Sequence, residues 1–188
     1  SAVKGKLGLV PNMTRAMANS PAALEGYLGL SGSLSQGSLS PKTREQIALA
    51  VGQANSCDYC LAAHSTIGKM VGLTNEQILD SRRATAVDSK NNALLGFVRL
   101  LVDQRGHVSD GDLATLRSVG FDDGTIAEVV ANDLRPTIDA QLAEMLRDPA
   151  VTTMVARSLR SRSTSASCPA SARPRASSSI ARDSKKKS

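Results

Sequence analysis

Two cysteines and a histidine are the residues of this sequence that point to a definite chemistry. Cys57 and Cys60 are separated by two residues, and His64 follows Cys60 by four positions. On a helix, positions offset by three, four and seven residues share one face, so these side chains would lie together. Two thiols at this spacing can form a disulfide, and the imidazole places a base beside them. The pattern predicts a redox site.

The predicted position of the pair also favours the thiolate, which is the reactive form of cysteine. A helix that begins here has Cys57 at its first position and Cys60 in its first turn, where free N–H groups and the helix dipole stabilise an anion. His64 lies one turn further on, close enough to exchange a proton with Cys60 directly or through a water. Glu45 is one of several acids that could orient the imidazole. Tyr59 either packs or forms a pocket wall with its hydroxyl near the sulfurs.

Zinc binding is the weaker interpretation of the same residues. A structural zinc site uses four ligands. Cys57, Cys60 and His64 supply three, and only His107 or Cys168 could complete the set. We therefore expect no metal.

The elements that position these residues are predicted to be helices. Aromatic residues make up only 2% of the chain, whereas strands favour aromatic and β-branched residues. No segment alternates apolar and polar residues, and Ser20-Pro21 and Ser40-Pro41 each resemble an N-cap followed by proline at the first helical position. The predicted helices cover residues 21–35, 41–55, 57–71 and 86–104 and a segment that starts at 122 or 123, with short helices opened by capping pairs at 74–77 and 109–112. The fold class is therefore all-α.

The chain divides into a body and a basic tail. We expect one helical domain over residues 1–159, since the length suits a single core. From residue 160 onward, eight Lys or Arg stand against one acid, a charge of +7, so the net charge of +6 leaves the body at about −1. The composition of 160–188 is typical of a disordered segment, and a basic arm that contacts acidic surfaces is the alternative. The body shows no charge pattern for binding nucleic acid.

Sequence features also bear on the compartment. No apolar run approaches the roughly 18 residues that a membrane span needs, and the first residues lack the apolar segment of a signal peptide. Three cysteines are too few for a disulfide-stapled secreted scaffold. We therefore expect a cytoplasmic protein without membrane or nucleic-acid partners.

The spacing of Glu45, Cys57, Cys60 and His64 resembles the signature of a known family. It is similar to the alkyl hydroperoxidase D branch of the carboxymuconolactone decarboxylase family, in its peroxidase-related subgroup. The helix over residues 43–51 also resembles the helix that precedes this motif. The resemblance runs from about residue 6 to residue 132.

The resemblance implies a fold, an activity and partners. It implies a compact all-helical protomer that assembles into a homo-oligomer, a trimer or a hexamer, and that reduces hydroperoxides without metal, haem or flavin. Cys60 would attack the peroxide, Cys57 would resolve the sulfenic acid as a disulfide, and His64 backed by Glu45 would move the proton. A dithiol reductant, such as a lipoyl-bearing protein or a peroxiredoxin, would reduce the disulfide again. In place of the family's final helix, we expect residues 137–146 to pack as an amphipathic substitute.

Two other functions remain open at this point. The family also includes decarboxylases and lactone-processing enzymes, but that branch does not rely on a Cys-x-x-Cys pair, so the pair argues against it. A non-enzymatic module that senses redox state or binds partners would use the same kind of reactive cysteines.

Overall fold

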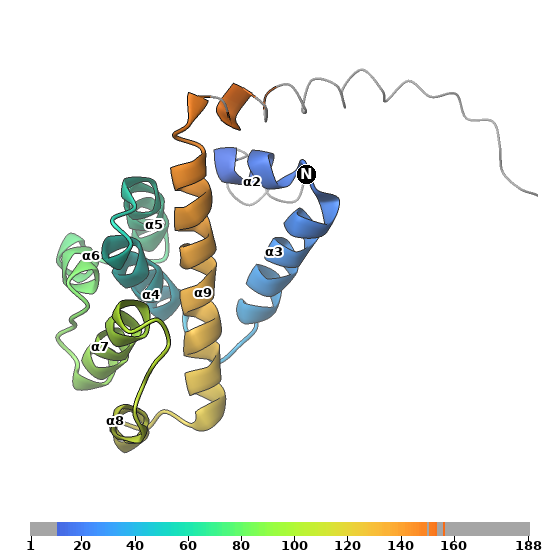
Figure 1. The fold of residues 1–188 in the computed structure, drawn as a ribbon. Coiled ribbons are helices and arrows are strands. Elements are labelled where there is room, and N and C mark those ends of the chain that lie inside the picture. The colour runs from blue at the N-terminus through green and yellow to red at the C-terminus, as the bar shows by residue number, and fades with distance from the viewer. Residues whose placement is uncertain (1–10, 150, 154–155, 157–188) are drawn as a thin grey trace, which may run out of the picture.

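The computed structural model describes residues 11–149, 151–153 and 156. Among these residues the regular elements are helices, as predicted, and no strand is found. They are α2 (Asn12–Met17), α3 (Pro21–Leu34), α4 (Pro41–Ala54), α5 (Asp58–Met70), α6 (Asn75–Arg82), α7 (Ser89–Asp103), α8 (Asp110–Ser118) and α9 (Asp123–Met145), shown in Figure 1. The basic tail predicted over 160–188 and the start of the resemblance, before residue 11, lie outside the described residues.

Side-chain caps start most of these helices at the predicted positions. The hydroxyls of Ser20 and Ser40 each accept a hydrogen bond from the backbone N–H three residues on, and a proline follows each serine. Capping boxes open α6 and α8. These bonds satisfy N–H groups that have no partner inside the helix, so local sequence defines where the helices begin.

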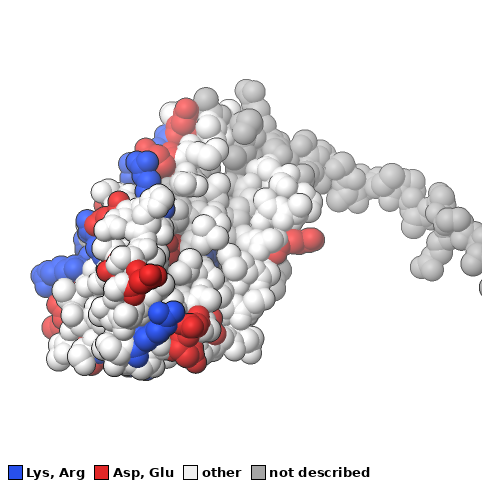
Figure 2. Space-filling model, turned by 60° about the horizontal axis from the view of Figure 1, so that its bottom comes forward, with Lys and Arg blue, Asp and Glu red and all other residues white. Residues whose placement is uncertain are grey.

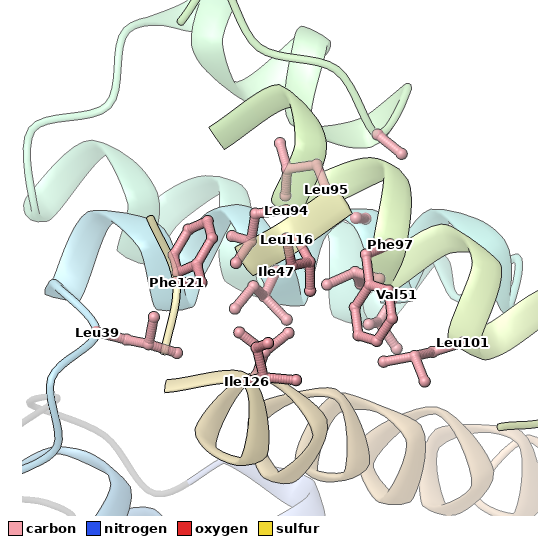
Figure 3. Close-up of a cluster of buried hydrophobic side chains, with 14 residues drawn as sticks. Leu39, Ile47, Val51, Leu94, Leu95, Phe97, Leu101, Leu116, Phe121 and Ile126 are labelled. Carbon is pink, nitrogen blue, oxygen red and sulfur yellow. The ribbon is translucent and has the colours of Figure 1, made fainter. Parts of the chain in front are cut away.

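The main hydrophobic core lies where α4 meets α7, α8 and α9 (Figure 3). Every residue of α4 from Glu45 to Gly52 is buried. Ile47, Leu94 and Val129 are fully buried at the centre of the cluster. Because α4 is enclosed by these neighbours, the position of Glu45 is determined by close packing of the core rather than by a surface loop.

The long helix α9 continues through a proline. Pro136 has no N–H to donate to the carbonyl of residue 132, which normally weakens or bends a helix. Pro136 is buried here, and the side chain of Asn132 donates a hydrogen bond to the carbonyl of Glu128 at 2.8 Å. The helix expected over residues 137–146 therefore forms the second half of α9, whose last residue is Met145. Helix α9 packs against α4 and α5, and Asp139 of its second half lies beside His64 of α5.

Helix α3 contributes little to this core. None of its residues is buried, and Glu25 is its only charged residue. In Figure 2, charged side chains gather on the left and at the bottom, whereas the right side, where α3 lies, is almost uncharged. Such a surface suits the predicted oligomer, which itself stays a prediction. In the part of the chain that the structure describes, no helix is long and apolar enough to cross a membrane.

Candidate active site

The two cysteines form a disulfide at the beginning of α5. The sequence analysis placed Cys57 at the first position of this helix, which would make the preceding residue, Ser56, its N-cap. Ser56 has a φ of 52°, a left-handed conformation that follows the end of α4, so it cannot take the extended backbone of an N-cap. Cys57 takes the N-cap instead, and its Sγ accepts the backbone N–H of Cys60 at 3.1 Å. Both sulfurs therefore lie at the positive end of the helix dipole.

His64 and Glu45 form a buried pair beside the disulfide. The distance from His64 Nδ1 to Glu45 Oε2 is 2.7 Å, a strong hydrogen bond, and both side chains are almost fully buried. The bond orients the ring, so that Nε2 is the nitrogen left for other partners. Sequence spacing left several acids open as the partner of His64, and the structure selects Glu45.

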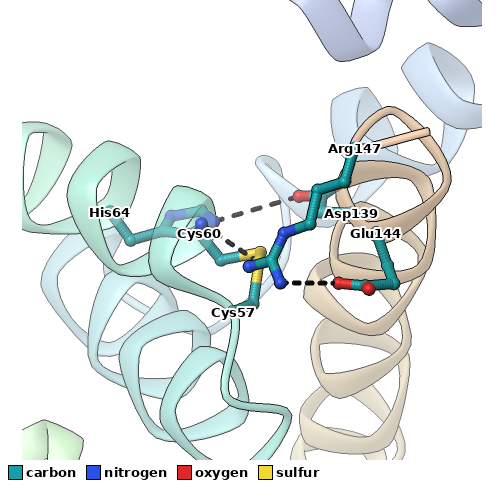
Figure 4. The surroundings of a disulfide bond; sticks show 6 residues. All are labelled: Cys57, Cys60, His64, Asp139, Glu144 and Arg147. Carbon is teal, nitrogen blue, oxygen red and sulfur yellow. Dashed lines mark hydrogen bonds and ion pairs between the residues drawn. A yellow bond between two sulfur atoms is a disulfide. The ribbon is translucent and has the colours of Figure 1, made fainter. Parts of the chain in front are cut away.

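A second carboxylate, which the sequence analysis missed, faces the other ring nitrogen. Asp139 of α9 has its Oδ2 3.9 Å from His64 Nε2, an ion-pair distance rather than a hydrogen bond. The residue is 3% exposed, and its Oδ1 has no hydrogen-bond partner among the described residues. Figure 4 shows Asp139 on α9 facing the helix that carries His64 and Cys60. This buried carboxylate oxygen can therefore accept a hydrogen bond from a donor group of a ligand.

The site opens into a cavity of about 470 Å³, which we call the Cys60 cavity. Cys60, His64, Glu45, Asp139 and Tyr59 line it together with residues of α3, such as Tyr27, Leu28 and Ser31. Tyr59, 40% exposed, is one of the residues that line this cavity. The cavity joins an apolar wall to a small group of polar atoms, which is the usual composition of a small-molecule site.

Opposed effects set the pKa of His64. Burial lowers the pKa, since an imidazolium loses its hydration. The nearby carboxylates of Asp139 and Glu45 outweigh burial, so that the pKa of His64 is raised above its ordinary value, although the charge of Arg135 opposes them. The ring therefore keeps its proton to a higher pH than a free histidine and can donate it from Nε2.

Burial and Asp139 also affect the two tyrosines of the cavity. Burial, followed by the charge of Asp139, raises the pKa of Tyr27 and of Tyr59. Their hydroxyls remain protonated donors near neutral pH. The cavity thus offers neutral and cationic proton donors beside Cys60. Within the described residues, no group of three His, Cys, Asp or Glu side chains is placed to hold a metal ion.

Comparison with known proteins agrees with this geometry. A profile of the carboxymuconolactone decarboxylase family matches residues 21–103, which include Glu45, Cys57, Cys60 and His64. No curated protein matches the sequence significantly. Solved structures give further matches.

Two similar structures are uncharacterized peroxidase-related proteins. One, from Silicibacter sp. TM1040, is 25% identical over 76% of this chain and 78% of its own, with a TM-score of 0.70. The other, from Ralstonia eutropha JMP134 and described as an alkylhydroperoxidase AhpD core, has the same identity and coverage and a TM-score of 0.67. The debrominase Bmp8 is 15% identical over 83% of this chain and 87% of its own, with a TM-score of 0.68, and shows a shared fold alone. These findings agree with the sequence prediction: residues 21–103 match the carboxymuconolactone decarboxylase family, and the chain is similar to peroxidase-related proteins with the alkylhydroperoxidase AhpD core.

Proposed function

We propose that the protein is a thiol-dependent hydroperoxide reductase. The observation that carries the proposal is the Cys57–Cys60 disulfide, which borders, through Cys60, a cavity that also holds His64 between two carboxylates. The cavity volume of about 470 Å³ favours an organic hydroperoxide over hydrogen peroxide alone. The apolar wall from α3 would bind the organic group, and the polar end would bind the O–O–H group.

The reaction begins from the reduced protein. The thiolate of Cys60 attacks the outer oxygen of ROOH, the O–O bond breaks, and the electron pair leaves with RO⁻. His64 donates the proton from Nε2, which releases ROH, and Cys60 becomes a sulfenic acid. Asp139, whose Oδ1 has no partner in the described part of the chain, accepts the hydrogen bond of the hydroperoxide O–H and holds the outer oxygen near the sulfur.

The sulfenic acid is then resolved and the disulfide reduced. The Cys57 thiolate, stabilised by the Cys60 N–H at the helix N-cap, attacks the sulfur of Cys60 and releases hydroxide, which becomes water. The product is the disulfide seen in the structure. A dithiol reductant, such as a lipoyl-bearing protein or a peroxiredoxin, restores both thiols by exchange. In this proposal the protein acts in the cytoplasm as a homo-oligomer, a trimer or a hexamer, that uses the apolar surface of α3.

Hydroperoxide consumption with excess dithiothreitol tests the proposal. All proteins carry Cys168→Ser, which removes the third thiol of the sequence. Cys60→Ser should abolish turnover, because it removes the nucleophile. Cys57→Ser should allow a single oxidation and leave a sulfenic acid on Cys60 that dimedone labels, because nothing resolves it. Full turnover by Cys60→Ser would refute the proposal.

The same preparations separate the two alternative functions. Carbon dioxide release from a carboxylactone by the variant that lacks both Cys57 and Cys60 would favour the decarboxylase branch. Oxidation of the wild type that changes partner binding, without catalytic turnover, would favour a redox sensor.

A further inference from the structure

The disulfide stands between two separate cavities. The Cys60 cavity is lined by Cys60 but not by Cys57. A second cavity, of about 290 Å³, is lined by Cys57 but not by Cys60, and we call it the Cys57 cavity. Its walls come from the turn before α5 and from the end of α9, and they include Asn55, Ser56, Ala140, Ala143 and Arg147. The two cavities share no lining residue, so the two cysteines border different spaces.

We infer that the Cys57 cavity is the binding site of the reductant, a slender dithiol that attacks Sγ of Cys57 while the hydroperoxide uses the Cys60 cavity. The inference rests on the proposed function and adds to it a site and a direction of attack. The incoming thiolate forms a bond to Cys57 Sγ, the bond between the two cysteines breaks, and its electron pair goes to Cys60 Sγ. The second thiol then attacks the reductant's own sulfur in this mixed disulfide and releases the Cys57 thiolate. The protein gains two electrons and the dithiol becomes a disulfide.

The leaving group favours attack on Cys57 rather than on Cys60. Thiol–disulfide exchange is faster when the departing thiolate is more stable. Attack on Cys57 releases Cys60, which lies in the first turn of α5, one helical turn from His64 and its raised proton affinity. His64 can then protonate Cys60 after the bond breaks. The Cys57 thiolate released in the second step is in turn stabilised by the Cys60 N–H at the N-cap.

The dimensions and chemistry of the Cys57 cavity indicate the kind of reductant. Its volume is at the lower end for a small-molecule site, and short side chains such as Ser56, Ala140 and Ala143 form much of its wall. An unbranched dithiol, free or carried on a flexible arm, fits such a space better than a folded domain. Figure 4 shows Glu144 and Arg147 of the same cavity on the α9 side of the disulfide. Their ion pair, 3.0 Å long, is mostly exposed. The guanidinium of Arg147 is therefore already balanced by Glu144, and the cavity carries no net charge from this pair.

A test measures the two half-reactions separately, with dithiothreitol as the reductant and cumene hydroperoxide as the oxidant. Ala143→Trp fills the Cys57 cavity, and Ala127→Trp places the same side chain on an exposed position of α9 as the control. Ala143→Trp should slow reduction of the disulfide by at least about tenfold, whereas oxidation of the reduced protein should change by less than about twofold. Ala127→Trp should leave both rates within about twofold of wild type. A wild-type reduction rate in Ala143→Trp, or equal slowing of both half-reactions, would overturn the inference.

A second measurement needs no substitution at the cavity and stays decisive if Ala143→Trp does not fold. The oxidised Cys168→Ser protein is treated with 2-mercaptoethanol, free thiols are blocked with N-ethylmaleimide, and fragment masses locate both groups. We expect the mercaptoethanol adduct on Cys57 and the maleimide on Cys60, and the reverse assignment would refute the inference. Neither reduction nor adduct mapping needs a peroxide. A protein that dithiothreitol reduces through Cys57 but that hydroperoxide does not oxidise would therefore disprove the proposed function and support the reductant site.

Discussion

Replacing Asp139 with asparagine should lower the pKa of His64. The substitution keeps the shape of the side chain but removes a buried negative charge 3.9 Å from His64 Nε2. At an effective dielectric constant of about 20, two unit charges about 4 Å apart attract by about 4 kcal/mol. One pKa unit corresponds to about 1.4 kcal/mol, so this interaction limits the decrease to about 3 units. Relaxation and water entry reduce the effect, so we expect a clear decrease in the pKa of His64 that stays well below this limit.

An NMR titration of the histidine ring protons measures this decrease directly. The sequence has two histidines, so exposed His107 provides the reference signal. The oxidised protein is used, because disulfide-bonded cysteines do not titrate. Asp123→Asn is the matched control, since it removes the same charge from the exposed start of the same helix. If Asp139→Asn lowers the pKa of His64 no more than Asp123→Asn does, then Asp139 does not raise the pKa of His64. The proposed role of Asp139 beside the Glu45–His64 pair would then be wrong.

Other predictions concern stability and use urea or thermal unfolding. Burial raises the pKa of Asp133 to about 6, so the folded protein binds this proton more tightly than the unfolded chain, and stability falls as pH rises from about 4 through 6. Asp133→Asn should remove that loss and add about 1 kcal/mol near pH 7, after a discount for partial exposure; equal pH dependence in both proteins would contradict this. Leu116→Ala, at a position 1% exposed in the core, should cost about 2–5 kcal/mol, and a loss below about 1 kcal/mol would show a core that adapts. Gly29→Ala on α3 meets nothing within 4 Å of the new Cβ and should add up to about 1 kcal/mol through helix propensity, whereas a lower melting temperature would indicate a hidden contact.

The part of the site on one helix could be predicted from the sequence, and the part on other helices could not. Spacing alone placed Cys57, Cys60 and His64 on one face, because helical periodicity is a local property. The partner of His64 required the resemblance to a family. No local pattern pointed to Asp139. It is far from His64 in the sequence, and Pro136, three residues before it, usually indicates the end of a helix.

The same limit explains what was missed in the fold. Caps and prolines marked where helices begin, since each cap is a bond within a few residues. Helix α9 continues past Pro136 and packs against α4 and α5, and these contacts between distant segments are not part of any local pattern. Ser56 is a better intrinsic N-cap than Cys57, yet the tight turn after α4 gives Ser56 a left-handed backbone and leaves the cap to Cys57. The tertiary structure, rather than the local preference for serine, therefore places Cys57 Sγ at the N-cap of α5.

The continuation of α9 is also what gives the disulfide two different sides. Asp139 lines the Cys60 cavity, and its neighbour Ala140 lines the Cys57 cavity. Successive residues of a helix point about 100° apart, so one helix can form a wall of each cavity. Loss of helix after Pro136 should then slow oxidation and reduction together, whereas Ala143→Trp should slow reduction alone. The contrast separates damage to α9 from blocked access to Cys57. It follows that the proposed catalytic cycle depends as much on the second half of α9 as on the cysteine motif itself.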